Sequence, residues 1–501
     1  MESSPATADR AILIASVTTL QNGGFAPAEP DLEGVDWLEV RADLVGDLDA
    51  RHLARTFSGK LLYTLRSRAE GGAFEGSPER RKRRLLDAAK RFDLVDLEGA
   101  RDLSPDILKA VPPEKRIFSW HGSATPVEGL KVTFDKMAAE PAALYKLVPT
   151  ALQPGEELAP LMLLQSLGRR DVAAFAAGPV GAWTRFVAPR LGAPVVYGSL
   201  GEVPAAPGQL SIDRLRRDYG LPELPPVQSL FGIVGNPVTH SLSPRIHNAA
   251  YRALGIPAAY LPFHTDSFGE FWLEVVEHGV LETLGMPIRG LSVTAPFKET
   301  ALAVAGAESP LAGMIGAANT LVWNQGVWEA EATDPDGVVL PLRDRGIAIE
   351  GLEAAVVGAG GAGRSAAFGL MNAGARVTIF NRDPGRGQTS ADLLKLPFQP
   401  LSALDPSRFD LLVNATSLGR GERDALPFAV DRLRSGAVVI DLVYHLDRPT
   451  RLLAEAAARG AVAIDGREVL VDQARGQFRM MTGQDLPVNL ARLVAGLEAA
   501  P

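Results

Sequence analysis

The sequence predicts an α/β protein in two halves, a (β/α)8 barrel followed by two smaller α/β domains. Three observations support this. Eight short apolar runs recur at even spacing in the first half, a proline-rich stretch interrupts the chain, and a glycine-rich turn lies between an apolar run and a helical pattern in the second half. At 501 residues the chain is also too long for one compact core.

Composition narrows the classes of function. With 22% charged residues and a formal net charge of -8, neither nucleic acid nor an anionic membrane is an expected partner. The absence of cysteine excludes disulfides, thiolate metal ligands and a cysteine nucleophile. We see no run long enough to span a bilayer and no secretory signal at the start. We therefore expect a cytoplasmic protein without a metal, as a monomer or a homodimer.

The first half alternates strand-like and helix-like segments. Helical patterns, such as residues 77–91 and 158–168, separate the apolar runs. Eight such strand–helix units within about 220 residues predict a (β/α)8 TIM barrel. The expected strands are residues 11–15, 37–41, 61–66, 94–98, 116–121, 143–148, 172–176 and 194–198.

Charged side chains and one histidine lie within or at the far ends of these apolar strands. A charge inside a barrel is costly unless it is paired or used, and barrel enzymes place their chemistry at the carboxyl ends of the strands. Any one of these residues could belong to a structural ion pair. Structural ion pairs are a poor explanation for six such residues at equivalent positions of the strands. The six residues are Glu39, Arg41, Arg66, Glu98, His121 and Lys146.

Lys146 has the most informative surroundings of the six. It lies in an apolar strand, where burial and nearby cations should lower its pKa and free a neutral amine. A neutral amine attacks a ketone to give an imine. His121, on the preceding strand, is a plausible proton shuttle beside it.

The first half resembles type I 3-dehydroquinate dehydratase over nearly all of residues 8–215. The matching motifs are Glu-Val-Arg-Ala-Asp at 39–43, Thr-Leu-Arg at 64–66, Glu-Gly-Gly at 70–72, Ser-Trp-His at 119–121, Tyr-Lys at 145–146, Gly-Pro-Val-Gly at 178–181 with Arg185, and Ala-Pro-Gly-Gln at 206–209. The set of motifs, in this order, is specific to the family. One departure is Ala205, where the family usually has serine.

This resemblance implies a Schiff-base dehydration of 3-dehydroquinate to 3-dehydroshikimate. Lys146 would bond to the C3 ketone, and His121, oriented by Glu70, would move protons at C2 and at the leaving C1 hydroxyl. Arg185, with Arg66, would clamp the substrate carboxylate. The other substrate-binding residues implied are Glu39, Arg41 and Gln209.

The proline-rich stretch at residues 217–228 divides the two halves. Its three prolines cannot continue a helix or a central strand, and a short helix over residues 211–219 should end at Gly220. A new apolar strand begins at residue 229. We therefore place the barrel at residues 1–218 and the linker at residues 219–228.

The clearest motif of the second half is Gly-Ala-Gly-Gly-Ala-Gly at residues 358–363. An apolar strand precedes it and a helix follows, which is the context of a dinucleotide fingerprint. The next strand ends at Asn381 and Arg382 rather than at an acidic residue, and Arg386 follows. This favours the 2′-phosphate of NADP(H), although Asp383 stands where threonine or serine is more usual. The loop residues expected at the cofactor are Gly358, Gly360, Gly361 and Ala362.

The second half resembles shikimate dehydrogenase over residues 229–500. The match runs through Ser-Leu-Ser-Pro at 241–244, Val-Thr at 293–294 to Lys298, Gly-Ala-Ala-Asn-Thr at 316–320, Thr-Asp at 333–334, the glycine turn, Asn-Arg at 381–382, Asn-Ala-Thr-Ser-Leu-Gly at 414–419, Tyr444 and Gln473. It implies a substrate domain of residues 229–338 and 467–501, with a Rossmann NADP domain of residues 339–466 inserted. Departures are Ser292 and Ala332, each in place of asparagine.

The resemblance also implies residue roles. Lys298 and Asp334 would form the catalytic dyad, and Thr416 would lie at the cofactor. Ser243 is also the expected N-cap of a helix with Pro244 at its first position. The residues implied for the substrate are Ser241 and Ser243 for the carboxylate, and Thr294, Asn319, Tyr444 and Gln473 for the ring hydroxyls.

The whole chain is thus expected to dehydrate 3-dehydroquinate and to reduce the product to shikimate with NADPH. Two alternatives stay open. The second half acts on quinate or uses NAD, or the chain is a binding or regulatory protein that keeps both folds without catalysis.

Overall fold

The computed structural model describes residues 9–20, 32–421 and 424–498. The chain forms two compact units. The first contains Met1–Gln228 together with Phe263–Pro287, and the second contains Ser229–Pro262 together with Ile288–Pro501. Among the described residues, no helix combines the length and the apolar character needed to cross a membrane.

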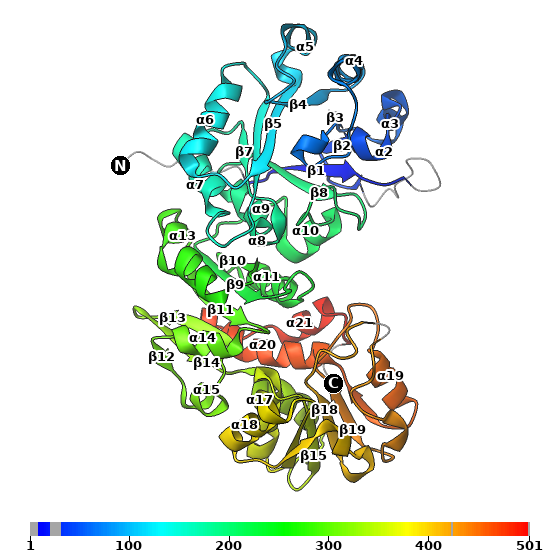
Figure 1. The fold of residues 1–501 in the computed structure, drawn as a ribbon, viewed down its shortest axis with the longest axis vertical. Helices are drawn as coiled ribbons and strands as arrows, with labels where there is room; N and C mark the ends of the chain where they lie inside the picture. Colours follow the sequence, from blue (N-terminus) through cyan, green and yellow to red (C-terminus); the bar gives the residue numbers. More distant parts are fainter. Residues whose placement is uncertain (1–8, 21–31, 422–423, 499–501) are drawn as a thin grey trace. The chain divides into compact units, whose positions relative to one another are not determined.

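The first unit contains the predicted barrel, drawn from blue to green in Figure 1. Its eight strands are all parallel, in the order β7-β6-β5-β4-β3-β2-β1-β8. All eight lie where the sequence predicts them. Their bounds are β1 Ile12–Val17, β2 Trp37–Arg41, β3 Lys60–Thr64, β4 Leu94–Glu98, β5 Arg116–Ser123, β6 Leu144–Thr150, β7 Val172–Ala174 and β8 Val195–Ser199.

From β2 onward, helices separate successive strands of the barrel. The helix α4 begins with Ser77, whose side chain accepts a hydrogen bond from the backbone of Arg80, and has proline in its first turn. The helices are α2 Ala42–Val45, α3 Ala50–Thr56, α4 Pro78–Ala89, α5 Pro105–Ala110, α6 Val127–Ala138, α7 Leu158–Leu167, α8 Gly178–Gly181, α9 Thr184–Val187 and α10 Ile212–Tyr219.

The helix that precedes the proline-rich stretch ends where the sequence predicts. The helix α10 stops at Gly220, which has a left-handed φ of 70°. The following residues do not leave the barrel at once, because Pro222 accepts a 2.9 Å hydrogen bond from Ala11 and Leu224 donates one to Asp9. The first part of the expected linker is therefore paired with the N-terminal segment.

The segment Phe263–Pro287 belongs to the same compact unit as the barrel. It contains α12 Phe268–Phe271, a π-helix Trp272–Glu277 and α13 Val280–Thr283. The ring of Phe263 lies 5.2 Å from that of the fully buried Trp183, and Gln165 donates a hydrogen bond to the carbonyl of Thr283. The substrate domain expected from the sequence, residues 229–338 and 467–501, included this segment.

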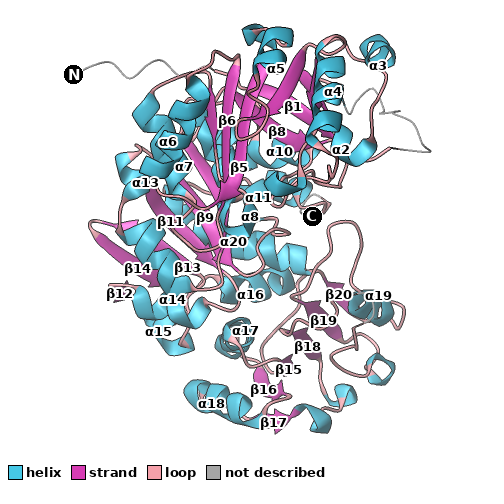
Figure 2. Cartoon of the chain, turned by 45° about the horizontal axis from the view of Figure 1, so that its top comes forward, coloured by secondary structure: helices cyan, strands magenta, loops and turns pink. Residues whose placement is uncertain are grey.

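The second unit contains two six-stranded sheets. The first is mixed, in the order β10-β9-β11-β13-β14-β12, and the second is parallel, in the order β17-β16-β15-β18-β19-β20. The parallel order is 3-2-1-4-5-6, the doubly wound order of dinucleotide-binding domains. Figure 2 shows the parallel strands with α17 and α18 beside them.

The elements of the mixed sheet and its helices are β9 Ser229–Gly235, α11 Ser243–Leu254, β10 Ala258–His264, β11 Ile288–Val293, α14 Lys298–Val304, β12 Ala307–Glu308, α15 Pro310–Ile315, β13 Thr320–Asn324, β14 Val327–Glu331 and α16 Asp334–Asp344. Those of the parallel sheet are β15 Glu353–Val357, α17 Gly361–Asn372, β16 Arg376–Asn381, α18 Pro384–Leu394, β17 Phe398–Pro400, β18 Leu411–Asn414, β19 Val438–Asp441, α19 Arg451–Ala457 and β20 Val462–Ile464.

The chain returns to the mixed sheet through α20 Gly466–Thr482 and α21 Val488–Val494. A capping box of Asp465 and Glu468 starts α20. Its buried face, including Val471 and Phe478, packs into the core around Phe231 of the mixed sheet. This return places residues of α20 beside those of α16, more than 100 positions earlier in the chain.

Candidate active sites

The polar side chains of the barrel strands share one face of the sheet. In the parallel register Lys146 pairs with Ser119, and His121 lies two residues after Ser119 on the same strand. Glu98 also pairs with Ser119. Because residues in register or two apart point to the same side, these side chains all face the barrel interior.

Lys146 is buried on β6, with 7% of its surface exposed. Its Nζ lies 4.0 Å from the centre of the Tyr197 ring. Burial lowers its pKa to about 8, assisted by the charges of Arg66 and Arg41 and opposed by nearby carboxylates. The predicted lowering of this pKa is thus confirmed, and about one amine in ten is neutral at pH 7.

His121 is held by Glu70 at two points. Its backbone amide donates a 3.0 Å hydrogen bond to Oε2 of Glu70, and its ring Nδ1 lies 3.2 Å from the same oxygen. Burial and neighbouring cations, led by Arg66 and Lys146, lower the pKa of His121 well below 6.5. Burial raises the pKa of Glu70 to about 7. The ring is therefore neutral at pH 7, and its Nε2 is left able to accept a proton.

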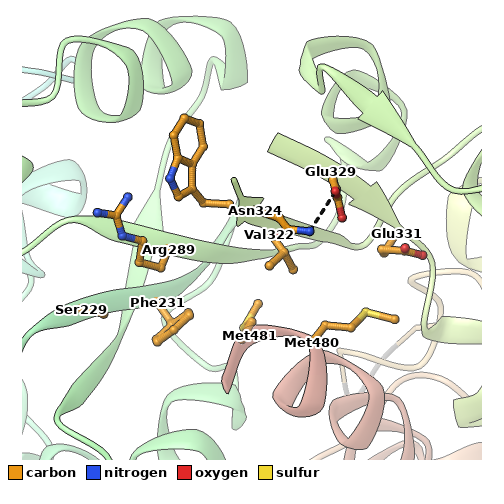
Figure 3. Close-up of a pocket in the computed structure, with 10 residues that line it drawn as sticks. Ser229, Phe231, Arg289, Val322, Asn324, Glu329, Glu331, Met480 and Met481 are labelled. Carbon is orange, nitrogen blue, oxygen red and sulfur yellow. Dashed lines mark hydrogen bonds between the residues drawn. The ribbon is translucent and has the colours of Figure 1, made fainter. Parts of the chain in front are cut away.

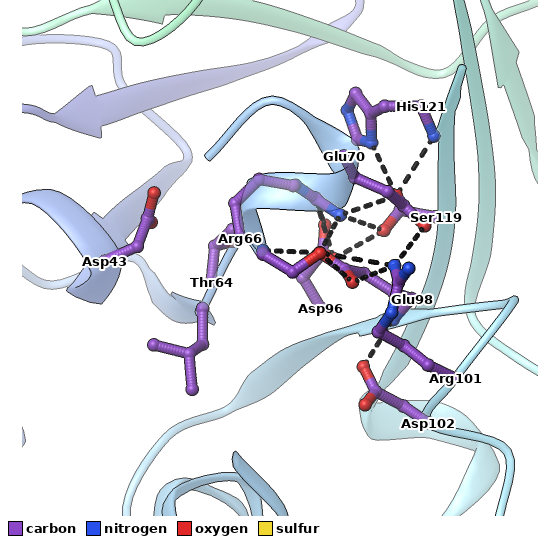
Figure 4. A network of polar contacts seen from close by, with 12 residues as sticks. Asp43, Thr64, Arg66, Glu70, Asp96, Glu98, Arg101, Asp102, Ser119 and His121 are labelled. Carbon is purple, nitrogen blue, oxygen red and sulfur yellow. Dashed lines mark hydrogen bonds and ion pairs between the residues drawn. The ribbon is translucent and has the colours of Figure 1, made fainter. Parts of the chain in front are cut away.

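Arg66 lies at the centre of a buried network, drawn in Figure 4. Its Nη2 donates to both oxygens of Asp96 at 2.9 Å, and its Nη1 donates to Ser119 at 2.8 Å. Nη1 also reaches Glu70 at 3.3 Å and Glu98 at 3.4 Å. The guanidinium is therefore already engaged by carboxylates, and it holds the glutamate that orients the histidine.

Arg185 differs from Arg66 although both are buried. Its guanidinium carbon lies 4.7 Å from the centre of the Phe175 ring, and Nη2 makes one long bond, 3.4 Å, to the carbonyl of Pro207. Its Nε is buried without a hydrogen-bond partner, and no ion pair to it occurs among the described residues. Burial lowers its pKa to about 10. A buried cation without a counter-ion is suited to bind an anion.

The remaining predicted residues of the barrel lie close to one loop. Glu39 accepts hydrogen bonds from Ser16 at 2.5 Å and Thr64 at 2.7 Å. Arg41 donates to the carbonyl of Ala205, and Gln209 accepts from the amide of Ala205. The backbone of Ala205 therefore keeps the loop in place without the hydroxyl that serine would supply.

Sequence reasoning missed several residues of this site. Asp96 and Ser119 lie two positions before Glu98 and His121 on the same strands, so strand alternation could have indicated both. Asp43, which binds Arg41 with two hydrogen bonds at 2.8 and 2.9 Å, was quoted only as part of a motif. Nothing in the local sequence pointed to Tyr197, because its ring is on β8 and Lys146, which it contacts, is on β6.

In the second unit, Lys298 and Asp334 form an ion pair between the starts of α14 and α16. Both side chains are 14% exposed. Asn319 donates a 2.7 Å hydrogen bond to the other oxygen of Asp334, so the carboxylate is held on both sides. The structure thus brings together three of the predicted residues from separate loops.

Two glutamines of α20 complete this arrangement. Gln473 accepts a 3.1 Å hydrogen bond from Asn319. Gln477, one turn later and fully buried, donates to the carbonyl of Asn319 and accepts from Ser292. Ser292 in turn accepts from Tyr260 at 2.6 Å. Gln477 was not predicted, although its position four residues after Gln473 places it on the same helical face.

The serines expected at the substrate carboxylate lie at the start of α11. The expected N-cap is wrong, because Ser243 is itself the first helical residue and its amide donates to Oγ of Ser241. Proline tolerates the first turn, so the helix starts one residue earlier than predicted. The hydroxyl of Tyr444 accepts a bond from the amide of Leu242, which places it beside both serines. Thr294 is partly buried at the end of β11, next to Gly235.

The glycine turn has the geometry of a dinucleotide loop. Gly358 has a φ of 116°, and a Cβ at Gly363 would lie 2.0 Å from the carbonyl oxygen of Gly358. Gly360 caps α17, which starts at Gly361 and continues through Ala362. The backbone can therefore approach a pyrophosphate at the helix N-terminus.

The residues expected at the 2′-phosphate lie beyond β16. Asn381 ends the strand, and Asp383 caps α18 by accepting a bond from the amide of Arg386, as serine or threonine would. Arg382 and Arg386 are exposed, and a Cβ at Gly360 would lie 3.5 Å from Nη2 of Arg386. Thr416 follows β18, and its Cγ2 would lie 3.3 Å from a Cβ at Gly358. These residues fit a phosphorylated dinucleotide.

A pocket of about 430 Å³ lies elsewhere in the second unit. It is lined by residues of β9, β11, β13, β14 and α20, including Arg289, Trp323 and Met481 (Figure 3). None of the predicted site residues lines it. The Lys298–Asp334 pair and the glycine turn, rather than this pocket, carry the chemistry we expect. In the described part of the chain, no group of three or more histidine, aspartate or glutamate residues could hold a metal ion.

Together, the fold and the sites define a lyase-type (β/α)8 barrel joined to a dinucleotide-dependent dehydrogenase. Comparisons with known families and proteins agree. Residues 28–224 match the type I 3-dehydroquinase family, and residues 233–321 match the shikimate dehydrogenase substrate-binding domain.

The relatives extend this match to the whole chain. The bifunctional 3-dehydroquinate dehydratase/shikimate dehydrogenase of Arabidopsis thaliana is 30% identical over 491 residues, which cover 91% of this chain and 79% of the relative. The NADP(+) shikimate dehydrogenase of Methanothrix thermoacetophila is 37% identical over 52% of this chain and 94% of its own length. A crystal structure of Aquifex aeolicus shikimate dehydrogenase, 30% identical, covers 53% of this chain and 97% of its own, with a TM-score of 0.49. The chain belongs to the bifunctional 3-dehydroquinate dehydratase/shikimate dehydrogenase family.

Proposed function

We propose that the barrel dehydrates 3-dehydroquinate through an imine on Lys146, and that the second unit reduces the resulting 3-dehydroshikimate to shikimate with NADPH. Family membership supports the pair of reactions. The observation that carries the dehydration is the burial of Lys146, which lowers its pKa to about 8. Without that shift, only about one amine in three thousand would be neutral at pH 7.

In the proposed dehydration, the Lys146 amine adds to the C3 carbonyl and water leaves, giving an iminium. His121 removes a proton from C2, and the electron pair moves into the iminium. The electrons then return to expel the C1 hydroxyl, which takes a proton from His121 and leaves as water. Hydrolysis of the imine frees the product and restores the amine.

Arg185 is the proposed anchor of the substrate carboxylate, because it is a buried arginine with no carboxylate partner among the described residues and it lies beside the loop carbonyl of Pro207. We had expected Arg66 to share this role. We now propose that Arg66 positions Glu70 and thereby His121, since its own donors are already occupied. Glu39, Arg41 and Gln209 would bind the ring hydroxyls.

In the proposed reduction, the Lys298–Asp334 pair supplies the proton to the C3 oxygen. The bound NADPH supplies the hydride. Asn319 fixes Asp334, and Gln473 lies beside Asn319, where each can meet a ring hydroxyl. Ser241, Ser243 and Tyr444 would take the carboxylate end, and Thr294 a hydroxyl. The exposed Arg382 and Arg386, with Asn381, would bind the 2′-phosphate, which favours NADP(H) over NAD.

Two finer statements belong to the same proposal. We propose a cytoplasmic location, on the ground that a chain without cysteine suits a reducing compartment, although the plant relative is described as chloroplastic. We also propose a monomer or a homodimer. Sedimentation velocity at several protein concentrations tests the second statement.

One incubation tests the proposed function. The full chain is supplied with 3-dehydroquinate and NADPH, and shikimate formation is followed together with the loss of NADPH absorbance. Borohydride reduction in the presence of 3-dehydroquinate should add the substrate mass to the peptide that carries Lys146. Absence of that adduct, with the enzyme folded, refutes the imine mechanism. Parallel assays with quinate and with NAD test the alternative for the second unit.

A further inference from the structure

Arg364 connects the glycine turn to the two segments that carry the proposed dyad and its amide. It follows Gly363 in the first turn of α17, and its side chain is 8% exposed. Its Nη2 donates a 3.0 Å hydrogen bond to the carbonyl of Gly316 and lies 2.9 Å from Oε1 of Glu299. Gly316 begins the loop that reaches Asn319, and Glu299 immediately follows Lys298.

The backbone of the glycine turn also packs against the stem of Lys298. A Cβ at Gly361 would lie 3.1 Å from Cβ and 3.3 Å from Cδ of Lys298. These distances are shorter than ordinary carbon–carbon contacts, so the absence of a side chain at Gly361 permits this close approach. The lysine stem therefore lies between the first residue of α17 and the carboxylate of Asp334.

Burial of the Arg364 side chain is unfavourable. Neither packing in an apolar cluster nor a contact with the phosphate-binding turn compensates for it. Its Nε is buried without a hydrogen-bond partner, which is unfavourable for a guanidinium. The side chain lies outside the apolar clusters of the second unit, and its Nη2 is occupied by Gly316 and Glu299 rather than directed to the turn. The contacts of Arg364 with Gly316 and Glu299 instead fix the distance between the cofactor turn and α14.

We propose that Arg364 and Glu299 are positioning residues that couple the dinucleotide turn to Lys298. With the turn held against α14, a cofactor bound at the turn and the ammonium group of Lys298 keep one geometry relative to the substrate. Misplacement of a reacting group by about 1 Å can cost on the order of 100-fold in rate. The inference rests on the proposed roles of Lys298 and Asp334.

The test compares full-length Arg364→Met, Arg364→Lys and Glu299→Gln with the unaltered enzyme. We measure kcat and KM for shikimate oxidation, the solvent deuterium isotope effect on kcat, and the NADPH dissociation constant from nicotinamide fluorescence. Arg364→Met should lower kcat about tenfold or more and raise the isotope effect, because proton transfer by Lys298 is slowed. The NADPH dissociation constant and the KM should change less than threefold.

Two further results separate positioning from a general loss of structure. Dehydratase kcat/KM is an internal control, since every residue proposed for that reaction belongs to the other compact unit, and it should not change. Arg364→Lys should recover part of the lost kcat, because an ammonium group reaches one of the two partners. The double variant Arg364→Met with Glu299→Gln should be no slower than Arg364→Met alone, because the two residues act as one unit.

Three outcomes would overturn the inference. They are unchanged kcat in both Arg364→Lys and Glu299→Gln, additive losses in the double variant, or loss of NADPH affinity at constant kcat, which would make Arg364 a cofactor ligand. If Arg364→Met does not fold, Glu299→Gln still decides, because it keeps the size of a half-exposed side chain and should therefore preserve the fold. Lys298→Met is the separate control, and its full activity would refute the proposed function itself.

Discussion

The guanidinium of Arg66 holds the carboxylate of Asp96 through two hydrogen bonds of 2.9 Å inside the barrel. Asp96→Asn removes this negative charge and leaves Glu70 and Glu98 as the carboxylates near Arg66. Because Asp96 supplies the two shortest carboxylate contacts of this buried guanidinium, we expect the barrel to lose about 3 kcal/mol of unfolding free energy. Urea denaturation measures the loss. Asp106→Asn, at an exposed pair with Lys82, is the matched control and should leave the stability almost unchanged.

Replacing Lys146 with methionine should abolish the dehydratase and yet stabilise the fold. The folded pKa of about 8 lies below the unfolded value of 10.5, so the native state is progressively penalised as the pH falls from 10.5 to 8 and uniformly penalised below 8. Methionine removes this penalty and also the contact with Tyr197, for a net gain of roughly 1–3 kcal/mol at pH 7. Denaturation at pH 7 and near pH 11 should show the gain at pH 7 alone. If Lys146→Met were less stable than the unaltered protein at pH 7, the free-energy cost assigned to the buried lysine would be refuted.

Arg185→Met should weaken binding of 3-dehydroquinate without harming the fold. The residue has no ion-pair partner among the described residues, so its removal breaks no internal pair. Loss of a charge-assisted bidentate contact predicts a KM higher by roughly 10- to 100-fold. Arg185→Lys should give an intermediate KM, because it keeps the charge without the planar fork. Steady-state assays of both reactions measure these KM values. An unchanged dehydratase KM in Arg185→Met would refute the proposed role of Arg185 as the carboxylate anchor.

Arg382→Ala combined with Arg386→Ala should reduce the preference for NADP(H) over NAD(H). Both side chains are exposed at the end of β16, where a 2′-phosphate would lie. We expect the ratio of kcat/KM values for the two cofactors to fall by roughly 10- to 100-fold, mainly through loss of NADPH activity. Arg376→Ala, at the other end of the strand and paired with Glu353, should leave the ratio unchanged. A similar fall in that control would show a non-specific charge effect.

Residues 1–228 expressed alone should keep the dehydratase reaction at reduced stability. None of the residues proposed for that reaction lies in the segment Phe263–Pro287, so kcat should stay within about threefold. Removing the segment leaves the ring of Trp183 without Phe263, so we expect a lower melting temperature and stronger 8-anilinonaphthalene-1-sulfonate fluorescence than in the full chain. A fragment as stable as the barrel of the full chain would show that the segment contributes nothing.

Most of the fold could be predicted because its signals are local. The eight barrel strands are apolar runs separated by helical patterns, and the dinucleotide turn is a run of glycines with a strand before it and a helix after it. The positive φ angles at Gly220 and Gly358 likewise depend on one residue and its neighbours in sequence. The segment Phe263–Pro287 could not be placed in this way, because its packing against the barrel depends on contacts with Trp183 and Gln165, far away in sequence.

The sequence by itself determined the kinds of chemistry present: a lysine within an apolar strand, a histidine on the preceding strand, and a lysine and an aspartate at turns before a glycine-rich loop. Only the tertiary structure decided how these groups share their partners. It shows Arg66 engaged by carboxylates and Arg185 without one, and it brings Gln477 to the carbonyl of Asn319 across more than 150 residues. The physical reason is that hydrogen bonding and desolvation depend on neighbours in space, and a residue type does not reveal which of two buried arginines is already neutralised.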